Sequence, residues 1–461
     1  MKTSSRGGIV LSASSFAVII VFFMISILFM PLTGEDILHK VSASGRSIPE
    51  MMSATYESIP RIGEVYQRSW SFMSFFSYTA TFGSDLVFRT IDILLCFVAI
   101  YVCATVIIGG RPRLRLRDGV VMLISFVALV CYNSSEIFTM CFSYLHNYIP
   151  IIALTGAVLY ILLRQKAYSK WILIFDTVVA VLCAASNEIV PIVFVLISIA
   201  LLVANIKLGN NKENRNKLLA VLIGLCLGMI YMYGNGSVLS RAGSSYGATY
   251  DYVSYFEFFS SPIYVVKDFV IHIAYNMRHL FGLIILLTIS VAIQYGKKKG
   301  EQLARSQAVC LAFSILYIIG VSQIMVLDDM ESRLLSPAFL SLVIGLGMLL
   351  PRYLEDIGES SKRNLYIISA GLLVMSLTAV LDISYLRIKE NIKYQPVLEA
   401  IETSSGSDYC ISAQDYSVDE SKLYNFKTYS PFESWTANYS TEIKIYDKEI
   451  QYAMECASNE G

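Results

Sequence analysis

The sequence contains eleven apolar runs close to the length that crosses a lipid bilayer. The first, residues 9–32, has 24 residues without a charged side chain, and about 20 apolar residues suffice to span the hydrocarbon core. Because backbone polar groups in lipid must be satisfied within the segment, each run predicts a helix rather than part of a barrel. The other runs are residues 86–108, 119–138, 148–163, 171–185, 189–205, 218–233, 280–296, 307–327, 334–350 and 364–381.

Composition supports a chain that lies mostly in lipid. Of its 461 residues 55% are hydrophobic and 16% charged, whereas soluble domains carry about 25% charged residues. The 36 basic and 36 acidic residues give no net charge, so nothing favours nucleic acid as a partner. The first run is longer than a signal peptide's and lacks its small-residue cleavage site, which predicts an uncleaved first span. We therefore expect an all-α polytopic membrane protein over residues 1–381.

Lys and Arg are unequally divided between the two sides of the predicted spans. Twenty lie on the side of the N-terminus, the three short opposite loops carry only Arg333, and the two long opposite loops carry seven. Because loops rich in Lys and Arg stay in the cytoplasm, this pattern predicts a membrane protein with its N-terminus inside and its C-terminus outside. The inside loops carry no P-loop or Rossmann glycine pattern, which argues against chemistry driven by a cytoplasmic nucleotide.

Two outer loops and the C-terminal tail stand apart from the spans. Residues 33–85 and 234–279 mix aromatic and charged residues, which predicts amphipathic helices on the outer membrane face. These helices either anchor the protein or form the wall of a groove for a lipid-linked substrate. Residues 382–461 are polar and predict a small periplasmic α/β domain, with a helix over 394–403 and strands near 407–412 and 442–447. In that tail Cys410 and Cys456 could form a disulfide in an oxidising compartment.

Adjacent acids follow the first span directly. Glu35 and Asp36 come after a short Pro-Leu-Thr-Gly break, which holds them close to the membrane surface where a lipid phosphate would lie. One interpretation is an ordinary solvated helix end. The other is a catalytic carboxylate that accepts the proton of an acceptor hydroxyl.

Further candidate residues lie on the predicted outer side. Arg61, Arg241 and Arg333 could each bind a phosphate, and each could equally be a surface cation, part of a linker or part of a salt-bridge cap. Asn187 and Glu188 interrupt an apolar hairpin, so either function or helix pairing must explain a carboxylate at that depth. His146 could bind sugar hydroxyls or cap the span that follows it. No clustered Cys and His indicate a metal site.

Taken together, these features resemble the GT-C superfamily of polytopic glycosyltransferases. The nearest likeness is to bacterial serotype-converting O-antigen glucosyltransferases. The matching segments lie between residues 30 and 340, and they are PLTGEDILHK, PRIGEVYQRSW, LHNYIP, SNEIVP, GNGSVLSR and ESRLLSP. The first long loop departs from the pattern because it lacks an obvious second acidic motif, and the tail has no clear counterpart.

The resemblance implies a specific reaction. Asp36, or Glu35 in its place, would be the general base, and an outer-face Arg would bind the phosphate of a polyprenyl-phosphate hexose. The hexose, expected to be glucose, would pass to a lipopolysaccharide O-antigen or another cell-surface glycan with inversion. Implied partners are the lipid-linked donor, the glycan acceptor, membrane lipid, a flippase and a donor-making synthase. Mg²⁺ or Mn²⁺ could bridge acids and phosphate, but the sequence requires no cofactor.

Two other interpretations stay open. An O-antigen polymerase or ligase would also have about 10–12 spans and act on the outer face, with basic outer loops and no acid pair after the first span. A transporter or lipid flippase would favour internal repeats and ionisable residues deep in mid-span.

Overall fold

The computed structural model describes the chain in several stretches. These are residues 6–28, 85–137, 142–164, 169–209, 211–234, 278–297, 300–324 and 335–351, isolated residues between 367 and 381, and residues 408–412, 442–445 and 448–453. Their helices are α1 (Arg6–Leu28), α5 (Asp85–Ile108), α6 (Leu116–Ile137), α7 (Phe142–Leu163), α8 (Lys170–Ala184), α9 (Ile189–Lys207), α10 (Lys212–Gly234), α15 (Arg278–Tyr295), α16 (Glu301–Ile324) and α17 (Ser336–Gly347).

Helices are present at ten of the eleven predicted spans, and the eleventh, 364–381, is described only as isolated helical residues. Four described helices are long and apolar enough to cross a membrane, namely Arg89–Ile108, Ile189–Lys207, Lys212–Tyr233 and Glu301–Val321. The helical class and an association with membrane are therefore confirmed. The number of spans and their orientation stay predictions.

Several helices extend beyond the apolar runs that predicted them. The first turn of α10 consists of the polar residues 212–217, and α7 begins at Phe142, six residues before its predicted start. Residues 132–147, expected as an outer loop, therefore belong mostly to α6 and α7. His146 lies inside α7, so the prediction that it caps a helix starting at residue 148 is wrong. Polar residues continue these helices because their backbone groups are satisfied whatever the hydropathy of the side chains.

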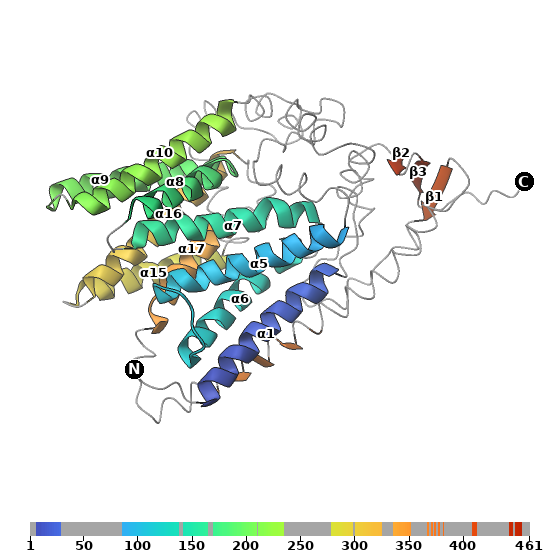
Figure 1. Cartoon of the computed structure of the whole chain (residues 1–461), viewed down its shortest axis with the longest axis horizontal. Coiled ribbons are helices and arrows are strands. Elements are labelled where there is room, and N and C mark those ends of the chain that lie inside the picture. Colours follow the sequence, from blue (N-terminus) through green and yellow to red (C-terminus); the bar gives the residue numbers. More distant parts are fainter. Residues whose placement is uncertain are drawn as a thin grey trace, which may run out of the picture.

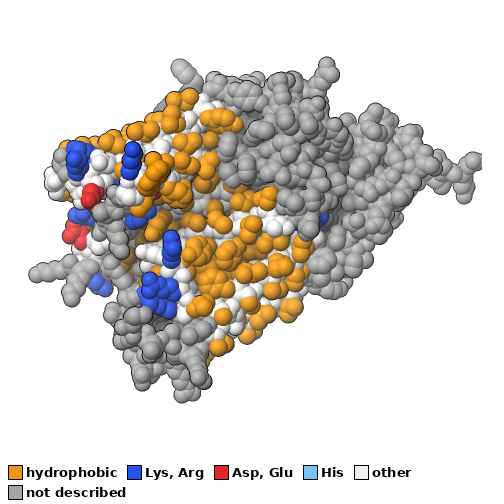
Figure 2. All heavy atoms as spheres, viewed as in Figure 1, with side chains coloured by type: hydrophobic (Ala, Val, Ile, Leu, Met, Phe, Trp, Pro, Cys, Tyr) orange, Lys and Arg blue, Asp and Glu red, His pale blue; other side chains and the backbone are white. Residues whose placement is uncertain are grey.

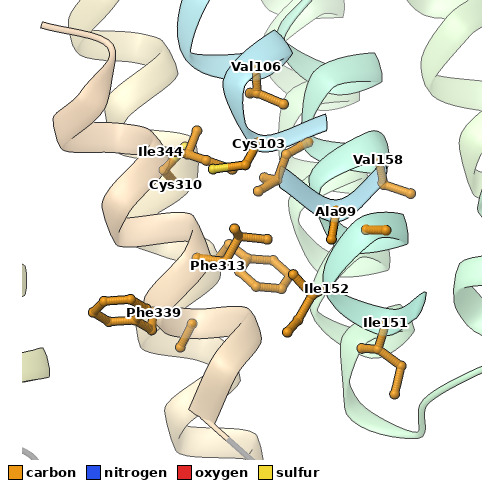
Figure 3. Packing of buried hydrophobic residues seen from close by; sticks show 14 of the residues in the cluster. Ala99, Cys103, Val106, Ile151, Ile152, Val158, Cys310, Phe313, Phe339 and Ile344 are labelled. Carbon is orange, nitrogen blue, oxygen red and sulfur yellow. The ribbon is translucent and has the colours of Figure 1, made fainter. Parts of the chain in front are cut away.

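The helices pack into a bundle in which neighbours in sequence are mostly neighbours in space (Figure 1). Helix α5 contacts α1, α6 and α7, while α16 contacts α9, α15 and α17. Figure 3 shows the interior between these groups, where Cys103 of α5, Cys310 and Phe313 of α16 and Ile344 of α17 point toward one another. Cys96, Cys103, Cys183 and Cys310 are buried and free and pack as small apolar residues, whereas Cys226 is free and exposed.

Two glycines allow α8 and α10 to approach closely. A Cβ atom on Gly224 would lie 2.5 Å from the carbonyl oxygen of Thr177, and one on Gly228 would lie 2.5 Å from that of Val181. Small residues at such contacts are the usual means of helix association in lipid, where apolar burial contributes little between helices. These glycines therefore fix the spacing of α8 and α10.

We expect Gly224→Val to destabilise the protein by about 1–3 kcal/mol, because the added side chain must push α8 away from α10. Thermal unfolding of the detergent-solubilised protein measures this change. Gly282→Ala in α15 is the matched control, since a Cβ atom there meets nothing within 4 Å. An equal loss of stability in both variants would contradict close packing as the cause.

Buried hydrogen bonds join α15, α16 and α17 within the apolar interior. The Ser290 hydroxyl donates to Gln307 Oε1 over 3.1 Å, and Gln307 Nε2 donates to the carbonyl oxygen of Gly345 over 2.9 Å. The Ser314 hydroxyl in α16 donates to the carbonyl oxygen of Ala338 in α17, and the Ser341 hydroxyl in α17 donates to that of Cys310 in α16. Such bonds between helices satisfy polar groups that lipid would leave without partners.

The tail contains a three-stranded sheet. Its strands are β1 (Asp408–Ser412), β2 (Glu442–Ile445) and β3 (Lys448–Ala453), in the order β1-β3-β2. Strand β3 pairs in parallel with β1 and antiparallel with β2. The strands predicted near 407–412 and 442–447 are confirmed, whereas β3 was missed. The predicted helix over 394–403 and Cys456 lie outside the described residues.

Candidate functional site

Contacts between helices place several chain connections at one end of the bundle. Three residue pairs relate α8 to α10. Asp176 interacts electrostatically with Lys217, Thr177 lies against Gly224, and Val181 lies against Gly228. The two helices are therefore parallel, and both begin at the same end. Arg164, directly after α7, binds Asp176, so α7 ends there. Figure 2 shows Lys and Arg side chains gathered at this end and hydrophobic side chains along the flanks. We call it the basic end.

The turn between α8 and α9 lies at the opposite end. The Asn187 side-chain oxygen accepts hydrogen bonds from the backbone N–H groups of Ile189 and Val190, both at 2.9 Å. This is the geometry of an N-cap, which satisfies donors that the first helical turn leaves open. Asn187 therefore starts α9, a local role that differs from both alternatives left open by the sequence, function and helix pairing.

Glu188 is half-buried and interacts with tyrosines from two other helices, α10 and α16. Its carbonyl oxygen accepts a hydrogen bond of 2.8 Å from the Tyr233 hydroxyl at the end of α10. The Glu188 carboxylate interacts electrostatically with the Tyr317 phenol in α16. The phenol of Tyr148 in α7 interacts with Tyr317 in the same way. Tyr317 is only 3% exposed and stacks on Phe313, with ring centroids 5.8 Å apart. One carboxylate and phenols from three helices therefore gather at this end.

This cluster is held together by close packing of α9 against α16. A Cβ atom on Gly320 would lie 2.7 Å from Ile189 Cγ2, so only glycine leaves room for the residue that follows Glu188. On the same two helices, the rings of Phe194 and Phe313 lie 4.6 Å apart between centroids. The position of Glu188 relative to Tyr317 is thus fixed by the interior of the bundle, and does not depend on a surface loop.

Of the residues proposed from the sequence, only Asn187 and Glu188 have described side chains. His146 lies two residues before Tyr148 in α7, and its backbone is therefore close to the tyrosine cluster, while its side chain lies outside the description. The proposed base, Asp36 or Glu35, and the proposed phosphate ligands Arg61, Arg241 and Arg333 lie outside the described residues.

The sequence did not single out Tyr148, Tyr233 and Tyr317 as neighbours of Glu188. Each is one of 30 tyrosines in the chain, and nothing in their spacing relates three separate helices. One signal was available for Tyr148 and Tyr233, which lie at the predicted outer boundary of a span, where tyrosine is enriched, whereas Tyr317 lies in the middle of the predicted run 307–327. That signal identifies an interface residue but cannot assign it to a cluster.

Charged side chains are also buried together at the basic end, and the sequence did not predict that they interact. Arg164 Nη2 donates to both carboxylate oxygens of Asp176, at 3.1 and 2.8 Å, and Asp176 is fully buried. Lys217, 1% exposed, donates from Nζ to the carbonyl oxygens of Leu162 (3.0 Å) and Arg164 (2.7 Å). One network thus joins α7, α8 and α10, and Lys217 satisfies carbonyls at the end of α7.

Metal binding was tested among the side chains that the structure describes. No group of three or more His, Cys, Asp or Glu residues in this part of the chain could hold a metal ion. The acidic pair at residues 35 and 36 is outside that set.

Neither a protein-family model nor a curated protein matches this chain. Its function must therefore be argued from its own residues.

Proposed function

We propose that the protein is a membrane glycosyltransferase of the GT-C type that acts on the outer face of a bacterial inner membrane. It moves a hexose, expected to be glucose, from a polyprenyl-phosphate donor to a lipopolysaccharide O-antigen or another surface glycan. The observation that supports this best is the half-buried Glu188, which accepts a hydrogen bond from Tyr233 at its carbonyl oxygen and interacts electrostatically with Tyr317, at the end of the bundle opposite the basic end.

The chemistry of this cluster suits a sugar. A carboxylate accepts hydrogen bonds from sugar hydroxyls, and phenols both donate and accept them. Aromatic rings present an apolar body beside a polar tip, which matches the mixed apolar and hydroxylated surface of a hexose. The cluster also has the right place, because a lipid-linked sugar lies at the boundary between lipid and water.

The reaction itself is assigned to the acids after α1. Asp36, or Glu35 in its place, takes the proton of an acceptor hydroxyl while that oxygen forms a bond to the anomeric carbon of the donor hexose. The bond from that carbon to the phosphate oxygen breaks, and polyprenyl phosphate leaves. One of Arg61, Arg241 and Arg333 stabilises the negative charge on the leaving phosphate. Displacement from the opposite face inverts the anomeric configuration.

Glu188→Gln tests the sugar-binding role of the cluster. We expect it to raise the KM for donor or acceptor by about tenfold or more, because an amide loses the charge-assisted hydrogen bonds of a carboxylate. The measurement is sugar transfer from polyprenyl-phosphate glucose by the protein reconstituted in liposomes. The unfolding temperature of the variant is measured alongside, so that a change in KM can be separated from a change in stability.

Asn187→Ala is the matched control at the neighbouring position. Loss of the cap should destabilise the protein by about 0.5–2 kcal/mol and leave the KM of the surviving folded protein unchanged. The reverse outcome, a kinetic defect for Asn187→Ala and none for Glu188→Gln, would show that the cluster does not bind substrate.

A further inference from the structure

The basic end carries far more positive than negative charge. Its described residues include twelve Lys and Arg residues but only Asp118, Asp176, Glu213 and Glu301 as acids. Three of the cations form ion pairs, namely Arg117 with Asp118, Arg164 with Asp176 and Arg305 with Glu301. A fourth, Lys217, is buried against backbone carbonyls. Most of the positive charge at this end is therefore left without an acidic partner.

The remaining exposed cations surround the bundle at the four helix connections of this end. Seven of these cations make no ion pair with another described residue. We call them the basic surface, and they are Arg111, Arg113, Arg115, Lys170, Lys207, Lys212 and Lys297. Each connection contributes at least one of them. Lys170 and Lys212 open the parallel helices α8 and α10 and thus lie at the same end of the bundle.

Each connection also exposes a large apolar side chain next to its cations. Leu114 lies between Arg113 and Arg115 and is 53% exposed, and Trp171 follows Lys170 and is 78% exposed. Leu208, beside Lys207, is 72% exposed and Tyr295, two residues before Lys297, is 63% exposed. Apolar anchors beside cations are the composition of segments that lie among lipid headgroups, with the apolar part in the acyl region and the charge at the phosphates.

We propose that the basic surface binds the anionic phospholipid headgroups of the leaflet at this end, with Trp171 inserted beside them. The occupant follows from charge complementarity, because seven cations without acidic partners face a layer that can supply phosphate. Each cation near an anionic membrane surface strengthens binding about fivefold. The proposal does not depend on sugar transfer, which takes place at the opposite end.

Brominated lipids and Trp171 fluorescence provide the test. The chain has three tryptophans, so Trp70→Phe and Trp435→Phe leave Trp171 as the single emitter in the full-length protein. The protein is reconstituted in phosphatidylcholine with 10% phosphatidylglycerol, and either the anionic lipid or an equal amount of the neutral lipid carries bromine. We expect brominated phosphatidylglycerol to quench Trp171 several-fold more than brominated phosphatidylcholine, and 1 M salt to remove the difference.

Charge variants separate binding from folding. Lys170→Gln, Lys207→Gln and Lys212→Gln combined should reduce the preference for phosphatidylglycerol, while the corresponding three Lys→Arg changes should retain it. Equal quenching by both lipids at low salt, or an undiminished preference in the triple Gln variant, would overturn the proposal. If the Gln variant does not insert into the membrane, the effect of 1 M salt on quenching in the protein with its native lysines is the test. A preference for phosphatidylglycerol that 1 M salt does not reduce would then overturn the proposal.

Discussion

Replacing Asp36 by Asn and Glu35 by Gln together is expected to lower the rate of sugar transfer by about 10²–10⁴-fold. The proposed general base then has no carboxylate, and proton transfer by a positioned base contributes about this factor to an enzymatic rate. Initial rates of transfer from polyprenyl-phosphate glucose to a glycan acceptor, measured with the reconstituted protein, give the effect.

The single variants separate the two acids. If Asp36 is the base, Asp36→Asn alone should reproduce most of the loss, and Glu35→Gln alone should stay within about tenfold of the unmodified rate. Membrane insertion and unfolding temperature serve as controls, because neither change removes an apolar span. A double variant that transfers sugar at the original rate would refute the assignment of either acid as the base.

The second large effect concerns stability and arises at Asp176. We expect Asp176→Leu to destabilise the folded protein by about 3–5 kcal/mol, because removal of one partner leaves the charge of Arg164 without compensation. Thermal unfolding in detergent measures the change. Glu301→Gln is the matched control, since the Arg305–Glu301 pair is more than half exposed and such pairs contribute about 0–1 kcal/mol.

A double variant distinguishes charge from packing. When Arg164→Met accompanies Asp176→Leu, no uncompensated charge of this pair remains, and apolar replacements of similar volume recover most of the stability. The double variant should therefore unfold at a higher temperature than Asp176→Leu alone. If instead Asp176→Leu leaves the unfolding temperature unchanged, the ion pair does not hold α7 against α8.

The helices could be predicted from the sequence because lipid makes one demand that hydropathy records directly. A segment in the hydrocarbon core must be apolar and must satisfy its own backbone, so runs such as 189–205 and 280–296 correspond closely to α9 and α15. The ends of the helices were less predictable than their positions along the chain. The polar residues 212–217 continue α10, because once outside the hydrocarbon core a helix no longer needs apolar side chains.

Residues of the candidate site were predictable only in part. Glu188 was proposed because a carboxylate in an apolar hairpin is costly, and that reasoning does not depend on the fold. Its tyrosine neighbours come from α7, α10 and α16, and such long-range packing leaves no periodic signal. Arg164 was counted as one of several orientation signals, whereas its guanidinium binds Asp176. A count of charges cannot tell a solvated cation from a paired one.

Linkage analysis of the cell-surface polysaccharide tests the central claim most directly. Polysaccharide is compared between cells that make the unmodified protein and cells that make the Glu35→Gln, Asp36→Asn double variant at the same level. The proposed function predicts a side-branch hexose, expected to be glucose, that is present with the unmodified protein and absent with the variant. Identical linkages in both, or a difference in chain length alone, would contradict it and favour transport or polymerisation, respectively.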